Sequence, residues 1–232
     1  LSQVNAANIT GSNTINSDST TQQVYNADET SLTITNSSTL SRSGQAAVNI
    51  NEQGDATLTI HSGSSLTATS HNTVQGKDQD GLTVTNSGTI SSGGSKAINL
   101  LNAQNSTVTN NAGGIIKSNT NTITLTENSG TGNNVTITNS GQIFAEAVSS
   151  GETNNNAIKS EDDTNNMTLI NNIGGHIYNN NSSATALQQA TVFIAAEDTA
   201  TLTNSGTIEN KAGPQNYAIR IAGSGVTVTL KD

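Results

Sequence analysis

One short phrase of alternating aliphatic and polar residues recurs along the whole chain. Its fullest copies are Leu82–Ile90 and Val135–Ile143, in which Thr alternates with Leu, Val or Ile before Asn-Ser-Gly. The phrase returns at intervals of roughly 24 to 33 residues, which is the repeat length of a solenoid. One aliphatic residue in each copy marks the register: Ile9, Ile34, Ile60, Val84, Val108, Ile137, Leu169, Leu202 and Val228.

Each repeat contains three stretches with the character of a strand. In the first, the period of two places Leu82 and Val84 on one face and Thr83 and Thr85 on the other. A second strand follows the register position and includes Ile15, Leu40, Leu66, Ile90, Ile116, Ile143, Ile177 and Ile208. A third strand includes Val24, Val48, Val74, Ile98, Ile123, Ile158, Val192 and Ile219.

Strands this short cannot bury an apolar face on their own. Stacking each repeat on the next buries the aliphatic residues in columns, and parallel crossovers are right-handed by default. The sequence therefore predicts an all-β fold: a right-handed parallel β-helix, or β-solenoid, of about nine coils with three short strands per coil. We expect one domain over residues 1–232.

An Asn follows the register position by two residues in most repeats. Its amide can bond to the equivalent amide in the next coil, so we predict a structural ladder. The predicted ladder consists of Asn36, Asn86, Asn110, Asn139, Asn171 and Asn204. Gly88, Gly141 and Gly206 come two residues later, where we expect a positive φ.

Composition alone would permit disorder, because hydrophobic residues are only 31% and aromatic residues 2%. The regular spacing of the aliphatic residues and a charged share of 11% argue against it. A net charge of −9 makes nucleic acid an unsuitable partner. The chain has no cysteine for disulfides or thiolate metal sites, and no apolar run long enough to span a bilayer.

Candidate catalytic groups are few. The three histidines, His61, His71 and His176, are not spaced as metal ligands. Glu161-Asp162-Asp163 is the one dense acidic cluster, and neighbouring acids on a turn do not by themselves form an acid–base pair. We therefore expect no enzymatic activity, no catalytic or metal site and no cofactor. Asp78 and Asp80 resemble the start of a calcium loop that lacks its remaining ligands, so a solvated turn is the preferred interpretation.

The Thr residues that flank the register positions would form two outward columns on one sheet. Such an array resembles the ice-binding face of some β-solenoids, with interruptions at His61 and Ile170. The alternative is that Thr is simply a good strand former that keeps an exposed sheet soluble.

Repeat length varies most between the second and third strands. The two longest connections, Ala145–Asn156 and Asn179–Gln189, belong to successive repeats and should project from one edge of the solenoid, which is often its binding edge. The candidate interaction residues there are Glu146, Ser149, Glu152, Asn154, Asn155, Asn156, Asn179, Asn180, Asn181 and Gln188.

The succession of a Thr-rich strand, Asn-Ser-Gly and an Ala-Ile phrase resembles the passenger domains of bacterial autotransporters (type V secretion). It is carried by Leu82–Ile90 with Ala97-Ile98, by Ile137–Ile143 with Ala157-Ile158, and by Leu202–Ile208 with Ala218-Ile219. The resemblance implies a rod exported through the outer membrane to the bacterial cell surface. It also implies a C-terminal membrane barrel absent from this sequence, so we expect a truncated passenger that meets the membrane only through that barrel.

We expect an adhesin that mediates bacterial aggregation and biofilm formation by self-association between rods, with virulence as the setting. The alternative partner is a host receptor, either a glycan or an extracellular-matrix protein. A polysaccharide-cleaving enzyme and an ice-binding solenoid are further alternatives.

Overall fold

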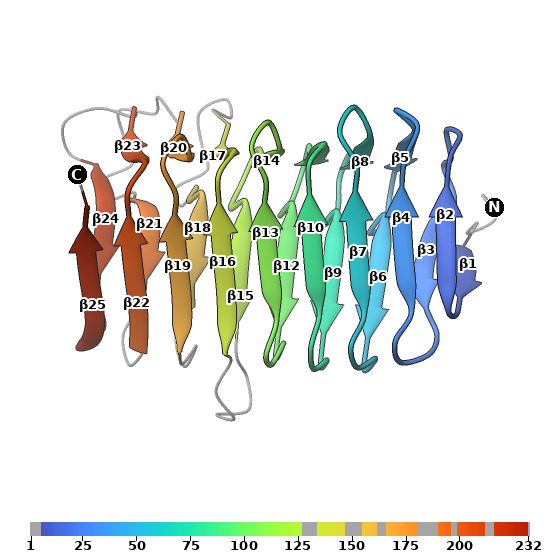
Figure 1. Ribbon diagram of the computed structural model, residues 1–232, viewed down its shortest axis with the longest axis horizontal. Coiled ribbons are helices and arrows are strands. Elements are labelled where there is room, and N and C mark those ends of the chain that lie inside the picture. Colours follow the sequence, from blue (N-terminus) through green and yellow to red (C-terminus); the bar gives the residue numbers. More distant parts are fainter. Residues whose placement is uncertain are drawn as a thin grey trace.

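The computed structural model describes residues 6–126, 134–146, 155–161, 166–180, 190–195, 199–211 and 216–231 (Figure 1). These residues form strands and turns without any helix, so they include no helix that could cross a membrane. The strands belong to three parallel sheets, which we call sheets A, B and C. Successive coils lie side by side along the long axis of the molecule.

Sheets A and B each contain nine strands and sheet C contains seven. Sheet A consists of β1 (Ala6–Ile9), β3 (Gln22–Tyr25), β6 (Val48–Asn51), β9 (Val74–Lys77), β12 (Ile98–Leu101), β15 (Ile123–Thr126), β18 (Ile158–Ser160), β21 (Ala190–Ile194) and β24 (Tyr217–Ile221). Sheet B consists of β2 (Ser12–Ile15), β4 (Ser31–Ile34), β7 (Thr57–Ile60), β10 (Thr83–Asn86), β13 (Thr107–Asn110), β16 (Val135–Asn139), β19 (Met167–Asn171), β22 (Thr199–Asn204) and β25 (Gly225–Leu230). Sheet C consists of β5 (Thr39–Arg42), β8 (Ser65–Ala68), β11 (Thr89–Ser92), β14 (Ile115–Ser118), β17 (Gln142–Ala145), β20 (His176–Asn179) and β23 (Thr207–Asn210).

The chain passes from sheet B to sheet C to sheet A and then into sheet B of the next coil. Each strand pairs in parallel with its equivalents in the coils before and after, as Val84 does with Leu58 and Val108. The predicted parallel β-helix of about nine coils with three strands per coil is therefore confirmed.

The core is a narrow column of aliphatic side chains contributed by all three sheets. Val84, Ile90 and Ile98, one from each sheet, are all completely buried in the same coil. Burying one such side chain contributes about 1.5–3 kcal/mol. The repetition of these small contributions from coil to coil explains how a chain so poor in aromatic residues forms a continuous core.

The register of the early coils differs from the sequence alignment by two residues. Ile60 had been aligned with Val84, but Ile60 pairs with Asn86, and Leu58 pairs with Val84. Strand alternation could not reveal this error, because a shift of two residues leaves every side chain on the same face. In the first coils, Ile9 lies in sheet A rather than sheet B, and Ile15 lies in sheet B, paired with Ile34.

The predicted amide ladder is present from Asn86 onwards. The Nδ2 of each Asn donates to the Oδ1 of the next, at 2.8 Å from Asn86 to Asn110, 2.9 Å from Asn110 to Asn139, 2.9 Å from Asn139 to Asn171 and 2.7 Å from Asn171 to Asn204. The inclusion of Asn36 was wrong. Ile34 occupies the column in that coil, and Asn36 is exposed in the following turn with a φ of 57°.

The reason predicted for Gly88, Gly141 and Gly206 was also wrong, because none of them has a positive φ. They are glycines because the main chain of the preceding coil is too close. A Cβ on Gly141 would lie 2.3 Å from the carbonyl oxygen of Gly114, and a Cβ on Gly88 would lie 2.3 Å from that of Ser64. Positive φ occurs instead at Gly63, Gly113 and Gly174 in the wider turns of the alternate coils.

Candidate functional site

The two long connections begin on adjacent strands of sheet C, as predicted, since Ala145 pairs with Asn179. Five of the ten candidate interaction residues are described by the structure: Glu146, Asn155, Asn156, Asn179 and Asn180. The other five lie outside the described residues: Ser149, Glu152, Asn154, Asn181 and Gln188.

Three of the described candidates are buried, and their amides are used within the coils. Asn155 donates to the carbonyl oxygen of Asn119 at 3.2 Å, Asn156 donates to that of Ala190, and Asn179 donates to that of Asn155. Their exposed fractions are 1%, 5% and 0%, so these amides are not available to a partner. They hold the corner between sheets C and A together because the main chain there needs donors.

The remaining two candidates lie nearer the surface. The carboxylate of Glu146 forms an ion pair with Lys117 at 3.0 Å, and the main-chain nitrogen of the half-buried Asn180 donates to Ala145 at 2.9 Å. Of the described candidates, Glu146 is therefore the one that presents a charged side chain to solvent.

Sheet C carries a stack of aromatic and cationic side chains that the sequence analysis missed. The rings of Phe144 and Tyr178 are 4.5 Å apart and nearly parallel, and Lys211 lies 4.2 Å from the centre of the Tyr178 ring. The signal was present in the sequence, because each aromatic residue directly follows a core Ile, Ile143 or Ile177. Residues at the same place in successive repeats stack.

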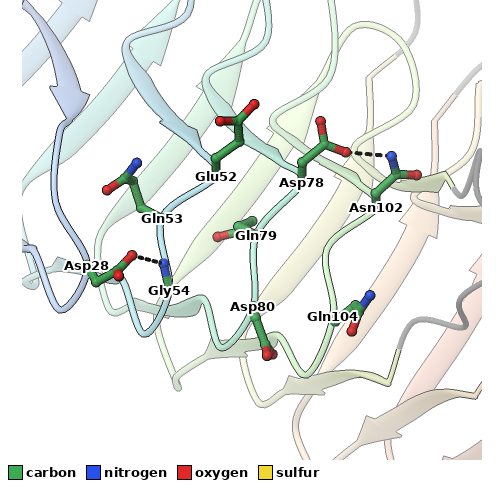
Figure 2. A pocket seen from close by; sticks show the side chains of 9 residues that line it. All are labelled: Asp28, Glu52, Gln53, Gly54, Asp78, Gln79, Asp80, Asn102 and Gln104. Atoms are coloured by element: carbon green, nitrogen blue, oxygen red, sulfur yellow. Dashed lines mark hydrogen bonds between the residues drawn. The ribbon is translucent and has the colours of Figure 1, made fainter.

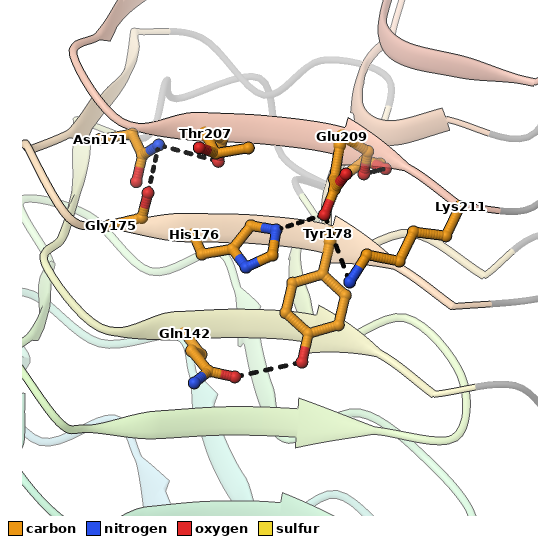
Figure 3. Close-up of polar contacts among 9 residues, drawn as sticks. Gln142, Asn171, Gly175, His176, Tyr178, Thr207, Glu209 and Lys211 are labelled. Carbon is orange, nitrogen blue, oxygen red and sulfur yellow. Dashed lines mark hydrogen bonds and ion pairs between the residues drawn. The ribbon is translucent and has the colours of Figure 1, made fainter.

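Polar contacts extend this stack across β17, β20 and β23 (Figure 3). The hydroxyl of Tyr178 donates to Gln142 at 3.1 Å, while Glu209 lies 2.7 Å from His176 and 3.2 Å from Lys211. Burial raises the pKa of Tyr178, and the nearby carboxylates of Glu146 and Glu209 add to the effect. Burial alone would raise the pKa of Glu209, but hydrogen bonds from His176 and Lys211 hold it below the usual value.

Carboxylates gather along the edge where sheet A turns into sheet B, which we call the acidic edge. Its described members are Asp28, Glu29, Glu52, Asp55, Asp78, Asp80 and Glu161. Part of this edge forms a shallow depression of ≈ 440 Å³ (Figure 2). The described residues contain no group of three or more His, Cys, Asp or Glu side chains placed to hold a metal ion.

Asp78 and Asp80 lie on either side of Gln79 and point apart, so they do not form the start of a calcium loop (Figure 2). Asp78 accepts a hydrogen bond from Asn102 at 2.6 Å, and Asp80 accepts one from Asn105 at 2.8 Å. The bond from Asn102, followed by the contact with Lys77, lowers the pKa of Asp78. Both acids bond to amides of the next coil, which is a structural role.

Gln79 is 3% exposed, and neither the nitrogen nor the oxygen of its amide has a hydrogen-bond partner among the described residues. The side chain points into the core, where its Nε2 lies only 2.7 Å from the place a Cβ on Gly76 would occupy. The small size of Gly76 therefore leaves room for Gln79. Gln79 is also one of the residues that line the acidic depression (Figure 2).

The outward face of sheet B is the most regular surface of the molecule, and we call it the hydroxyl face. Its first column is Ser12, Ser31, Thr57, Thr83, Thr107, Thr136, Thr168, Thr201 and Thr227. Its second column is Thr14, Thr33, Thr59, Thr85, Thr109, Thr138, Ile170, Thr203 and Thr229. The expected interruption at His61 was wrong, because Thr57 and Thr59 occupy that coil; the interruption at Ile170 is present.

These hydroxyl groups are free within the described part of the chain, where none of them hydrogen-bonds to another residue. Some outward side chains of the other sheets are bonded to one another, as Asn99 is to Gln75 on sheet A, or to a side chain beside the sheet, as Lys117 of sheet C is to Glu146. The nine strands of sheet B also contain no Asp, Glu, Lys, Arg or His. The face is uncharged and has unused hydrogen-bonding capacity along its length.

The candidate catalytic groups are dispersed. The exposed His61 and His71 contact the hydroxyl groups of Thr35 at 3.2 Å and Ser70 at 3.3 Å. Glu161 forms an ion pair with Lys159 at 2.9 Å, and Asp162 and Asp163 lie outside the described residues. Within the described residues, the structure brings none of these groups together with another.

Comparison with family models, with curated proteins and with solved structures gives no match to this chain. The observations on the molecule itself therefore carry the functional argument.

Proposed function

We propose that this chain is the exposed rod of a bacterial surface adhesin and that it holds cells together by contacts between identical rods. The observation that carries the proposal is the long, regular outer surface of the β-helix, along which the same polar side chains recur from coil to coil. A repeated surface multiplies a weak contact, and many rods on one cell multiply it again.

Export to the bacterial cell surface is part of the proposal. It is supported by the resemblance of the repeated phrase to autotransporter passengers, since Asn86, Asn139 and Asn204 with their following glycines serve the coil-to-coil packing of such a solenoid. Binding of a partner, without catalysis, is the activity we propose.

Beads coated with the purified chain test this function. We expect coated beads to aggregate with one another and not with uncoated beads, and soluble chain added in excess to inhibit the aggregation. The same beads mixed with host cells and with a glycan array measure the alternative. Beads that bind a glycan or a matrix protein without aggregating would contradict self-association.

A patch on sheet A favours a host glycan as the second candidate. Phe193 is half-buried, and the guanidinium of Arg220 lies 5.2 Å from its ring. Lys159, whose ammonium group is paired with Glu161, is the neighbour of Phe193 on the adjacent strand. Cationic groups around an aromatic ring suit an acidic saccharide. On the glycan array, Arg220→Gln should remove binding to acidic saccharides if this candidate is correct.

A further inference from the structure

We propose that the hydroxyl face of sheet B is the surface through which the rods associate, and that its partner is the hydroxyl face of a second, antiparallel copy. This inference rests on the proposed function, because antiparallel rods are the arrangement that joins two opposing cells.

The distribution of charged side chains favours this face as the contact. The chain has a net charge of −9, so two copies repel each other at most orientations. Lys117 and Glu209 lie on sheet C, Lys159 and Arg220 on sheet A, and sheet B carries no ionisable side chain in any of its strands. Sheet B is therefore the one sheet that can approach its own copy without burying charged side chains of its strands.

The unused hydrogen-bonding capacity of the hydroxyl groups favours the same face. Thr85 and Thr109 are partly exposed, and their hydroxyl groups have no partner within the described residues. A hydroxyl group both donates and accepts, so two hydroxyl columns are complementary to each other in any direction. The spacing between strands, about 4.8 Å, is the same in both copies, so the columns stay in phase along the whole contact.

The size of the contact predicts a weak pair. Nine strands at about 4.8 Å and a width of about 10 Å give an overlap that buries roughly 900 Å² in total, below the usual range of stable interfaces. One pair of rods should therefore dissociate readily in solution. Many pairs between two cells would hold them together.

Placing positive charges on the hydroxyl face tests its role. In Thr85→Lys/Thr109→Lys, the new charges lie on the fourth and fifth strands of the face. In the antiparallel pair the fifth strand faces its own equivalent, so the new charges of the two copies lie close together at the centre. The matched control is Thr67→Lys/Ser91→Lys, on neighbouring strands of sheet C. We expect bead aggregation to fall by about tenfold or more with the first variant and by less than about twofold with the control, with unchanged melting temperatures.

Cysteine cross-linking tests the orientation, because the chain has no cysteine of its own. With antiparallel copies in full overlap, the second strand of sheet B faces the eighth, so Thr33→Cys should form a disulfide with Thr203→Cys when the two variants are mixed on separate beads. Neither variant should cross-link to itself.

The outcomes separate the inference from the function on which it rests. If wild-type beads do not aggregate, the proposed function is wrong. If they aggregate and Thr85→Lys/Thr109→Lys aggregates equally well, the function stands and the hydroxyl face is not the contact. Self-linking of Thr33→Cys would show parallel pairing on one surface and overturn the antiparallel arrangement. Loss of ice shaping by the lysine variant, with aggregation intact, would assign the face to ordered water.

Discussion

At the scale of single residues, the buried amide column from Asn86 to Asn204 replaces part of the aliphatic core. Asn110 accepts from Asn86 and donates to Asn139 and to the carbonyl oxygens of Gly114 and Gln142. It is completely buried. Each amide inside the column therefore joins its neighbours in both directions, and the loss of one leaves polar atoms of two coils without partners.

We expect Asn110→Ala to lower the free energy of unfolding by about 1–3 kcal/mol, the cost of leaving buried polar atoms unsatisfied. The measurement is the midpoint of urea denaturation. Asn111→Ala is the control, since Asn111 is half-buried and, among the described residues, its amide bonds only to the hydroxyl group of Ser87, at 2.9 Å. The control should lose less than about 1 kcal/mol. Equal losses in the two variants would contradict a special role for the ladder.

Gly141 and Gly113 lie in adjacent coils and are glycines for two different reasons. At Gly141 another part of the main chain comes too close for a Cβ, and at Gly113 the backbone conformation is left-handed. A Cβ on Gly141 would meet the carbonyl oxygens of Gly114 and Asn111 at 2.3 and 2.5 Å, whereas Gly113 has free space around it and a φ of +81°. Gly141→Ala should therefore cost about 2–3 kcal/mol, because both clashing atoms belong to the main chain.

At Gly113 the left-handed conformation is the only constraint, so Gly113→Ala should cost about 1–2 kcal/mol, and Gly113→Asn less, since Asn adopts this conformation readily. Thermal denaturation of the three variants gives the order of the effects. If Gly113→Ala proved more destabilising than Gly141→Ala, the close approach of the preceding coil's main chain would not be the reason for a glycine at position 141.

At the scale of strands, the contact between β20 and β23 depends on pH through Glu209. Hydrogen bonds from His176 and Lys211 lower its pKa below the ordinary value of 4.5, against the opposing effect of burial. A carboxylate whose pKa is lower in the folded state than in the unfolded state stabilises the fold at any pH above its unfolded-state pKa. That stabilisation is lost as the pH falls through the folded-state pKa.

The melting temperature of the wild type should therefore decrease below a pH of about 4.5 more steeply than that of Glu209→Gln. The difference should correspond to less than about 1 kcal/mol, because the carboxylate is 41% exposed and its ion pairs are screened. Parallel pH profiles for the two proteins would show that Glu209 does not contribute.

The strands also show how far a sequence can specify a solenoid. Alternation predicted the faces of the three sheets, and the spacing of Ile90, Ile116 and Ile143 gave the register of the later coils. The sequence did not reveal the shift at Ile60, because Ile60 and Asn86 occupy the same inward column. An Ile in place of an Asn there leaves the alternation of inward and outward residues unchanged.

Prediction of the site was less complete for a related reason. The hydroxyl columns were visible in the sequence, but their continuity through Thr57 and Thr59 depended on the corrected register. Burial of Asn155, Asn156 and Asn179 could not be predicted, because polar composition does not distinguish an amide that binds a partner from one that satisfies a corner of the coil.

At the scale of the whole molecule, the acidic edge and the hydroxyl face determine how two rods meet. The acidic edge borders one long side of sheet B. When two copies pair face to face in the antiparallel direction, their acidic edges fall on the same side, about 10 Å apart as in packed sheets. In parallel pairing, each acidic edge would lie beside the opposite edge of its partner, between sheets B and C, where Asp18 is the one described carboxylate.

Antiparallel association should therefore strengthen with ionic strength. The Debye length is about 30 Å at 0.01 M salt and about 8 Å at 0.15 M, so repulsion between the two acidic edges is largely screened only at the higher concentration. We expect wild-type beads to aggregate several-fold faster at 0.15 M than at 0.01 M sodium chloride. Asp55→Asn/Asp80→Asn, which removes two of the seven described carboxylates of the edge, should aggregate with a smaller difference in rate between the two salt concentrations. Aggregation that weakens with added salt would indicate contacts between opposite charges, and the hydroxyl face, which has none, would not be the contact.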